Sequence, residues 1–104
     1  MGKQRFDVVV SAVAQADISA LKAFEQRKVT ESIQTNLIYE PFRETRNRKP
    51  LPGLVPGFEH VPPVWELRVG GIRVFYDGNA DTLTVNIRAV RLKPSGKTTE
   101  EITR

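Results

Sequence analysis

Two arginines on either side of a glycine pair are the first residues in this sequence whose types and spacing suggest chemistry. Residues 64–69 and 72–77 alternate between apolar and polar side chains and flank Gly70-Gly71, a pattern that predicts a two-residue β-hairpin. The register of such a hairpin places Arg68 directly opposite Arg73. Opposed like charges in a sheet cost up to about 1 kcal/mol unless an anion lies between them. The pair therefore predicts an anion-binding surface on the sheet.

Other side chains on the same predicted face bear on that anion site. Arg88, on the outward face of the following strand, is expected to extend the row, with Phe75 beside it as a stacking surface for a base. Because arginine keeps its proton and its charge, the candidates for proton transfer at this surface are Glu66 and Lys93. The alternative is that Glu66 and Asp77 neutralise the arginines in surface ion pairs, which contribute little to stability.

The positive charge of the chain lies in its second half. The formal net charge is +4, and residues 43–93 account for all of it, with nine basic and five acidic side chains. Arg46, Arg48 and Lys49 form a basic cluster before a proline-rich loop, and Arg91 lies near the end of the last predicted strand. These side chains are candidate phosphate contacts, so a polyanion is the leading class of partner. A charge of this size also fits a solvated surface kept for solubility.

The composition excludes several kinds of site. The chain has no cysteine and one histidine, His60, so it offers no thiolate zinc site, no thiol nucleophile and no histidine pair. We therefore expect no metal and no cofactor, and we interpret His60 as an ordinary loop residue. The apolar run 8–13 is too short to span a membrane and lacks the features of a signal peptide, which favours a cytoplasmic protein.

The elements that must position the candidate site can be predicted from apolar spacing. Residues 5–13 alternate and predict a first strand. Two helices should follow, one capped by Asp17 and one ending near Tyr39, with the charged run 25–28 between them and Pro41 beyond. Their apolar faces consist of Ile18, Leu21, Phe24, Val29, Ile33 and Leu37. Strand one is thus expected to lead into a helical hairpin.

The second half of the chain is expected to form a loop, a hairpin and a last strand. Residues 50–63 contain five prolines and two glycines, so we predict a surface loop without a regular element. A turn at 77–81 should lead into a strand over 82–92, and residues 98–101 have the form of a capping box that favours a short final helix. The apolar face of the hairpin, expected to pack on the helices, consists of Trp65, Leu67, Val69, Ile72, Val74 and Tyr76, and the last strand should add Leu83, Val85, Ile87 and Ala89.

This order of elements, together with two stretches of sequence, resembles the RelE/ParE superfamily, the toxin components of bacterial toxin-antitoxin modules. The stretches are residues 65–76, which read WELRVGGIRVFY, and residues 46–51, which read RNRKPL. The resemblance implies one α+β toxin domain over residues 1–104. Its expected order is β-α-α-β-β-β, with a mainly antiparallel, curved sheet packed on a helical hairpin around a basic groove.

The resemblance also implies a function and a partner. RelE-type members cut messenger RNA in the ribosomal A site, so the chain is expected to be a ribosome-dependent endoribonuclease that inhibits translation. The alternatives are a ParE-like toxin that inhibits DNA gyrase by binding, and a toxin whose active site is degenerate. In each case we expect a cognate antitoxin whose acidic, amphipathic segment covers the basic face and the helical hairpin.

The site residues of the family carry over only in part. Arg73 matches the arginine that opens the third strand of RNA-cleaving members, and Lys93 stands where the RelE branch usually has arginine. Two lysines expected before the hairpin are replaced by Val64 and Glu66, and the tail has no tyrosine. The expected catalytic set is therefore Arg73, Lys93, Arg68 and Glu66, with Arg46, Arg48, Lys49, Arg88, Arg91 and Phe75 as the expected RNA contacts.

Overall fold

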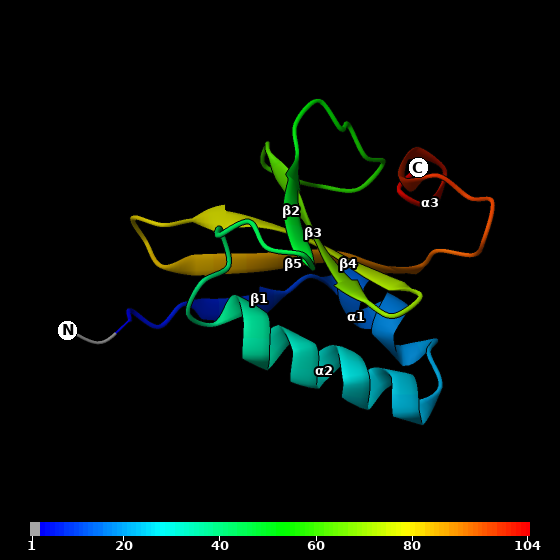
Figure 1. Cartoon of the computed structure of the whole chain (residues 1–104), viewed down its shortest axis with the longest axis horizontal. Coiled ribbons are helices and arrows are strands. Elements are labelled where there is room, and N and C mark those ends of the chain that lie inside the picture. Colours follow the sequence, from blue (N-terminus) through cyan, green and yellow to red (C-terminus); the bar gives the residue numbers. More distant parts are fainter. Residues whose placement is uncertain (1–2) are drawn as a thin grey trace.

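The protein is built around one sheet of five strands, seen in a computed structural model that describes residues 3–104. The elements are β1 (Asp7–Val10), α1 (Ala12–Ser19), α2 (Ala23–Leu37), β2 (Arg48–Leu51), β3 (Val64–Val69), β4 (Ile72–Asn79), β5 (Thr84–Leu92) and α3 (Thr99–Ile102). The strand order is β1-β5-β4-β3-β2, and only β1 and β5 run parallel. Helices α1 and α2 lie on one face, and α3 with the loop after β2 lies on the other (Figure 1). The predicted α+β fold is confirmed.

The predicted hairpin and its apolar face are also confirmed. Strands β3 and β4 pair in the expected register, with Arg68 opposite Arg73 and Val69 opposite Ile72. The apolar face packs on α2 through a buried cluster whose members include Val29, Ile33, Leu37, Leu67, Val69, Ile72, Val74, Tyr76, Val85 and Ile87. Because the turn and the apolar alternation both fix the register, this part of the fold follows from local sequence.

Helix α1 begins earlier than predicted. Ser11 is its N-cap, and the Ala14 N–H donates to the Ser11 hydroxyl over 3.1 Å. The predicted strand 5–13 is correspondingly shorter, and Asp17 lies inside the helix instead of capping it. A serine with an extended backbone is as good an N-cap as aspartate, so the earlier of two competing caps is used.

The break between the two helices also differs from the prediction. It falls at residues 20–22, so Phe24 belongs to α2 and half of it is exposed, at 51%. The charged run 25–28 lies inside α2 and helps to begin it, because the Lys22 N–H donates to the Glu25 carboxylate over 3.0 Å. A carboxylate at this position satisfies a backbone donor at the start of a helix.

Strand β2 corrects the prediction that no regular element enters residues 50–63. It includes Pro50 and Leu51 and pairs with β3, with Pro50 opposite Trp65. Since β2 is the edge of the sheet and the Arg68 N–H donates to Asn47, alternation of the ladder turns the nitrogen of Pro50 outward. Proline is tolerated at such edge positions, where no partner needs its missing N–H.

A shift in the pairing of β4 with β5 rearranges the last strand. Phe75 pairs with Ala89, whereas Tyr76 pairs with Ile87, which leaves Arg88 without an opposite residue. The extra residue turns Ala89 to the face away from α2, so the prediction that it faces inward with Ile87 is wrong. Strand β4 also continues to Asn79, so the turn predicted at 77–81 lies instead at residues 80–83 and includes Leu83, whose φ is 53°.

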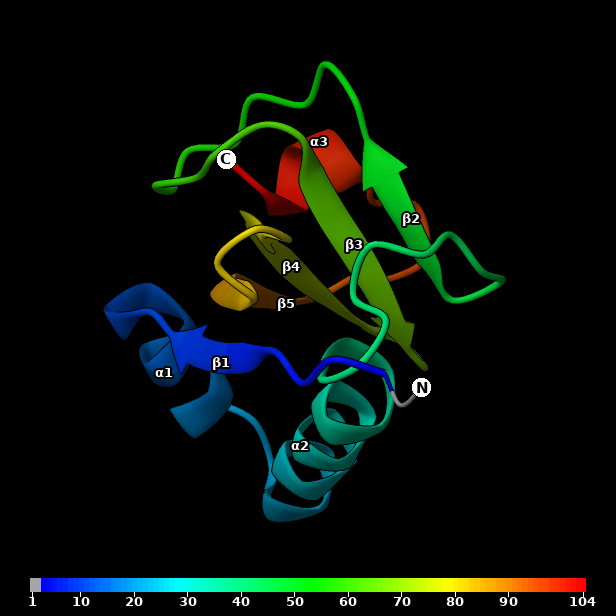
Figure 2. The same ribbon diagram turned by 90° about the vertical axis from the view of Figure 1, so that its left-hand side faces the viewer.

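A second apolar cluster closes part of the face opposite α2. It contains Phe58, Val64, Phe75 and Ala89, with Leu51, Leu54 and Ile102 packed against it. The loop and α3 therefore lie over the middle of this face, as the turned view also indicates (Figure 2). The Gly57 N–H donates to the Thr103 carbonyl over 2.7 Å and ties the loop to the C-terminal helix.

The predicted C-terminal helix is present as α3 and begins with the expected capping box. The Thr98 N–H donates to Glu101 over 3.1 Å, and the Glu101 N–H donates to the Thr98 hydroxyl over 3.2 Å. The first of these bonds is the main reason why the pKa of Glu101 lies below its ordinary value of 4.5. The ionised form of Glu101 is therefore the form that caps this short helix.

Arg48 joins β2 to the C-terminal end of α2. Its side chain is 8% exposed, and its Nη1 donates to the Asn36 carbonyl and, over 2.7 Å, to the Glu40 carbonyl. A cation at this position satisfies carbonyls that the end of a helix leaves unpaired and interacts favourably with the helix dipole. The prediction that Arg48 contacts RNA conflicts with this burial, because the guanidinium is used inside the protein.

Arg48→Met is expected to lower the free energy of unfolding by about 2–4 kcal/mol, because carbonyls that bonded a charged donor stay buried without it. Urea denaturation measures the loss. The matched control is Arg46→Met, an exposed arginine in the preceding loop, for which we expect a change within about 0.5 kcal/mol. Equal losses for the two variants would contradict this role of Arg48.

The capping bond of α3 makes a prediction about pH. Because the pKa of Glu101 is lowered in the folded protein, its stabilising effect is present above the ordinary pKa of 4.5 and is lost as the pH falls through the folded pKa. A carbon-13 NMR titration should give Glu101 a midpoint below 4.5 in the parent. In Thr98→Pro, which lacks the backbone donor, the midpoint should rise toward that value, and an unchanged midpoint would contradict the assigned cause.

Candidate anion-binding site

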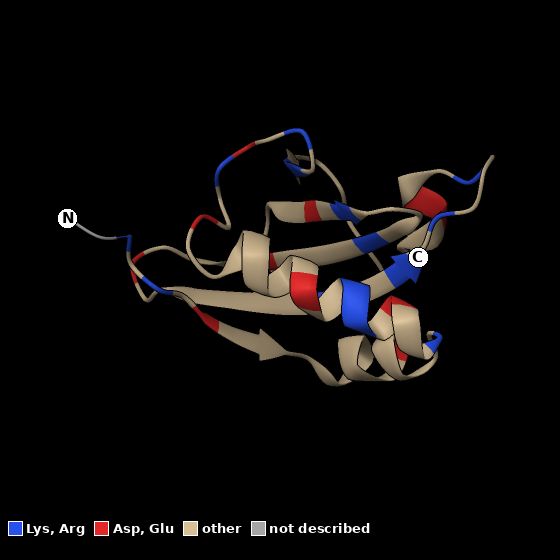
Figure 3. Ribbon diagram, turned by 60° about the horizontal axis from the view of Figure 1, so that its bottom comes forward, with Lys and Arg blue, Asp and Glu red and all other residues tan. Residues whose placement is uncertain are grey.

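Three arginines form a row across the middle of the sheet, on the face opposite α2. Arg68 on β3 is opposite Arg73 on β4, and Arg73 is opposite Arg91 on β5. Arg88 was expected to extend this row. Because the pairing of β4 with β5 shifts between Phe75 and Tyr76, the residue opposite Arg73 is Arg91, and Arg88 lies outside the row. Figure 3 shows Lys and Arg on the central strands. The predicted opposition of two arginines is thus part of a longer row.

The anion that this row requires is supplied by the protein itself. The Glu66 carboxylate lies 3.1 Å from Arg73 Nε and 3.7 Å from Arg68 Nε, measured at Oε1. Glu66 is 2% exposed and Arg73 is 12% exposed, so this is a buried pair and not the weak surface pair considered from sequence. The expectation that both arginines are free to bind an external anion is therefore wrong for Arg73.

The Arg73 guanidinium also binds the backbone of the hairpin turn. Its Nη1 donates to the Gly70 carbonyl over 2.7 Å and to the Ile72 carbonyl over 3.0 Å. Within the part of the chain that the structure describes, Arg73 Nε and Glu66 Oε2 have no hydrogen-bond partner, so the contact of Arg73 Nε with Glu66 is an ion pair without hydrogen-bond geometry. The cluster thus contains one carboxylate oxygen with unused accepting capacity next to two cations.

Arg91 holds three separate segments together. Its Nε donates to Asp17 Oδ2 over 3.0 Å, its Nη1 donates to the Ile102 carbonyl over 3.1 Å, and its guanidinium lies 5.6 Å from the centre of the Phe58 ring. These contacts come from α1, α3 and the loop after β2. Asp17, which sequence reasoning placed at a helix cap, is therefore a partner of the arginine row, and it also accepts from the Val90 N–H over 2.9 Å.

Arg88 belongs to a separate network further along the sheet. Its Nε donates over 2.9 Å to Asp77, whose side chain is 1% exposed and also accepts from Asn86 and from the Val61 N–H. Phe75, which lies between this network and the arginine row, is fully buried in the second apolar cluster. The prediction that Phe75 stacks on a base is therefore wrong, because the loop and α3 cover its ring.

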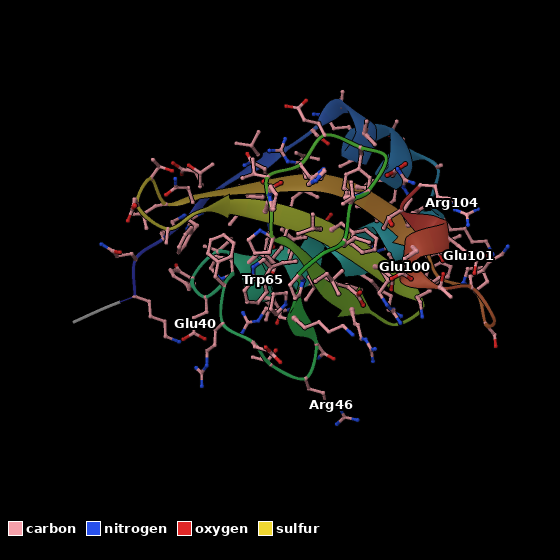
Figure 4. The ribbon with its side chains drawn as sticks, turned by 90° about the horizontal axis from the view of Figure 1, so that it is seen from above. Glu40, Arg46, Trp65, Glu100, Glu101 and Arg104 are labelled. Atoms are coloured by element: carbon pink, nitrogen blue, oxygen red, sulfur yellow. The ribbon has the colours of Figure 1, made fainter. Side chains whose placement is uncertain are left out.

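The cations that remain accessible lie at the β2 side of the sheet and near the hairpin turn. Arg46 and Lys49 are exposed, and half of the Arg68 side chain is exposed at 49%. Figure 4 shows Arg46 extending from the loop before β2.

Two lysines lie near the Glu66 cluster. Lys49 is opposite Glu66, and the Lys93 N–H donates to Gly71 over 2.8 Å. Lys49 and Arg68 therefore lie beside the buried cluster of Glu66 and Arg73, and Lys93 lies next to the hairpin turn.

A groove of about 560 Å³ separates β2 and its following loop from α3. Lys49 and Arg104 contribute cations to it, and Glu100 contributes a carboxylate, so its charge is mixed. Within residues 3–104 no cluster of three or more acidic or histidine side chains is suited to a metal ion. No helix in that span is long and apolar enough to cross a membrane.

Comparison with known proteins identifies relatives by structure and not by sequence. No protein-family model and no curated protein matches the chain. A chain of the toxin-antitoxin complex RelBE2 from Mycobacterium tuberculosis superposes with a TM-score of 0.69 and 25% identity, covering 86% of this chain and 99% of that chain. A chain of the archaeal RelE-RelB complex from Pyrococcus horikoshii gives a TM-score of 0.68 at 21% identity, covering 91% and 100%. The resemblance to RelE proteins predicted from sequence is confirmed at the level of the fold.

The buried pair should show strong coupling in a double-mutant cycle. Arg73→Gln alone is expected to cost about 3–5 kcal/mol of unfolding free energy, because it leaves the Glu66 carboxylate buried beside fewer cations. Glu66→Gln with Arg73→Gln should cost at least about 1 kcal/mol less than the sum of the single changes. Urea denaturation of the four proteins measures the coupling, and additivity within about 0.5 kcal/mol would contradict a direct interaction.

Proposed function

We propose that this chain is the toxin component of a toxin-antitoxin pair and that it acts in the cytoplasm. The observation that carries the proposal is the likeness to chains of two RelE-containing toxin-antitoxin complexes, over 86% and 91% of this chain. Nearly the whole of each matched chain is covered as well. A toxin of this kind binds an antitoxin, and the excess of basic side chains in this chain suits an acidic partner.

For its action we propose cleavage of messenger RNA on the ribosome, centred on Glu66, Arg68 and Arg73. Attack by a ribose 2′-hydroxyl needs a group that accepts its proton and cations that neutralise the phosphate. Glu66 is the carboxylate that contacts both Arg68 and Arg73, and its Oε2 retains accepting capacity. Lys93, next to the hairpin turn, supplies the proton that the departing 5′-oxygen requires.

The ion pair sets a condition on this mechanism. Arg73 is 12% exposed and already bonded, so a phosphate must replace the Glu66 carboxylate as its partner. The half-exposed Arg68 and the exposed Lys49 provide the first contacts for the incoming backbone, which attracts cations without regard to base sequence. Once displaced, the carboxylate lies beside the phosphate that it has to serve as a base.

A second candidate is a toxin that acts by binding alone, as an inhibitor of DNA gyrase. Its specific support is that Arg73, Arg88 and Arg91 are all paired with carboxylates, so little uncompensated charge faces a substrate. The tail also lacks a tyrosine. The same observations suit a toxin that has lost its activity and persists as the partner of an antitoxin.

Growth inhibition by an inducible gene, without any antitoxin, tests the proposal. The parent is expected to stop incorporation of labelled amino acids before that of thymidine. Because Arg73→Gln alone is expected to destabilise the protein by several kcal/mol, the test variant is Glu66→Gln with Arg73→Gln, which leaves the net charge of the cluster unchanged. This variant should lower RNA cleavage by about a hundred- to a thousandfold. Arg27→Gln, an exposed change on α2, serves as the matched control and should remain toxic.

The outcomes separate the candidates. Toxicity of the double variant equal to that of the parent would show that Glu66 and Arg73 have no catalytic role. Thymidine incorporation that stops first would identify the gyrase type of toxin. A parent that leaves growth unaffected would identify an inactive one.

A further inference from the structure

The C-terminal helix α3 covers one end of the arginine row. Arg91 Nη1 donates to the Ile102 carbonyl over 3.1 Å, so the end of α3 lies against this guanidinium. Arg68, Arg73 and Arg91 lie on three neighbouring strands, and two strand spacings make the row roughly 10 Å wide. A strand of B-DNA carries one charge per roughly 3.4 Å of its axis, so the row has room for more than one phosphate. Helix α3 thus occupies the place beside Arg91 that a second phosphate would need.

Few contacts hold α3 in this place. Within residues 3–104, Ile102 is the one side chain of α3 that packs against the second apolar cluster. Thr103, just after the helix, is buried, and its carbonyl accepts from the Gly57 N–H over 2.7 Å. A helix of 4 residues is not stable in water by itself. The helical form of this segment therefore depends on its docking against the sheet.

The segment that joins β5 to α3 is suited to act as a hinge. The Lys93 N–H donates to Gly71 and fixes the end of the strand. Residues 94–98, which follow, are all exposed, and Gly96 has a φ of 87°, a value that other residues rarely adopt. Figure 1 shows this linker leaving β5 and turning back to α3. Because a few loop residues of this kind can absorb large dihedral changes, α3 can move while the sheet stays in place.

The loop after β2, which lies on the same face, is held more firmly. Phe58 is 8% exposed in the second apolar cluster, and Leu51 and Leu54 pack against that cluster. The Val61 N–H also donates to the buried Asp77 carboxylate over 2.7 Å. Of the two segments on this face, α3 is therefore the one that is able to open.

We propose that α3 is a lid on the arginine row, that the substrate RNA displaces it, and that Arg91 then exchanges the Ile102 carbonyl for a second phosphate. The inference rests on the proposed cleavage of RNA. A phosphate is the stronger partner for arginine, because the hydrogen bonds are charge-assisted and can be bidentate. Asp17 accepts from Arg91 Nε over 3.0 Å, which keeps the guanidinium in the row while its Nη1 changes partner. The docked lid lowers the apparent affinity for RNA, since only open molecules bind.

Two substitutions that loosen the lid should raise the affinity for RNA. Thr98→Ala removes the hydroxyl that accepts from the Glu101 N–H, a bond made only in the docked helix. Gly57→Ala pushes the C-terminal segment away, because a Cβ at Gly57 would overlap the Arg104 carbonyl carbon. Calorimetry measures binding of an RNA trinucleotide with a 2′-deoxy sugar at the scissile position. Each lid variant should bind about fivefold more tightly than the parent. The control Thr35→Ala, exposed on α2, should stay within about twofold.

Distances between spin labels measure the movement of α3 directly. The chain has no cysteine, so introduced cysteines are the only positions that take a label. Thr35→Cys with Glu100→Cys joins α2 to α3, and the control, Thr35→Cys with Asp81→Cys, joins α2 to the turn before β5; all three positions are exposed. Binding of the trinucleotide should shift the first distance and leave the second unchanged.

The outcomes separate the lid from the function on which it rests. A shifted distance to Glu100, with tighter binding by Thr98→Ala and Gly57→Ala, would support the lid. If the parent binds the trinucleotide but that distance stays the same and neither variant binds more tightly, α3 is a fixed part of the site. The lid would then be wrong, whereas the proposed cleavage of RNA would stand. If the parent does not bind the trinucleotide, both proposals fail.

Discussion

The buried carboxylate of Glu66 is the constraint on which the arginine-rich face of the sheet depends. Three strands bring Arg68, Arg73 and Arg91 into one row, and such a row is unfavourable without negative charge beside it. Glu66 compensates Arg68 and Arg73, and Asp17 compensates Arg91. With most of this charge compensated, the loop after β2 and α3 can close over the neighbouring apolar cluster. The ion pairs that permit the second apolar cluster also reduce the positive charge that is available to a substrate.

The pairing shift in the last two strands decides which residues enter this site. Without it, Arg88 and Ala89 would face opposite sides of the sheet, as strict alternation requires. With it, Arg91 enters the row, and Arg88 joins Asp77 in a separate network. Bulges often redirect side chains near functional sites, and this one divides the basic residues into two groups on either side of Phe75.

Sequence predicted the parts of the fold that are set locally. The glycine pair and the alternating runs fix the hairpin register, the spacing of Val29, Ile33 and Leu37 fixes the buried side of α2, and the capping box predicts α3. The start of α1 was missed because two local caps compete, at Ser11 and Asp17, whereas the missed features of the site are set by distant contacts. The bond from Arg91 to Asp17 spans 74 positions in the sequence, and burial of Phe75 depends on the loop and α3. For the site, residue types on the sheet face were predictable, but which of them are buried and paired was not.

The most direct test of the account is the nitrogen-15 NMR signal of Arg73 Nε during titration with an RNA trinucleotide that carries a 2′-deoxy sugar at the scissile position. If a phosphate replaces Glu66 as the partner of Arg73, the signal should shift on binding, and Glu66→Gln should bind the trinucleotide more tightly than the parent. An unchanged Arg73 signal while Arg46 responds, with equal affinity in the two proteins, would contradict the account, because the buried pair would then be structural only.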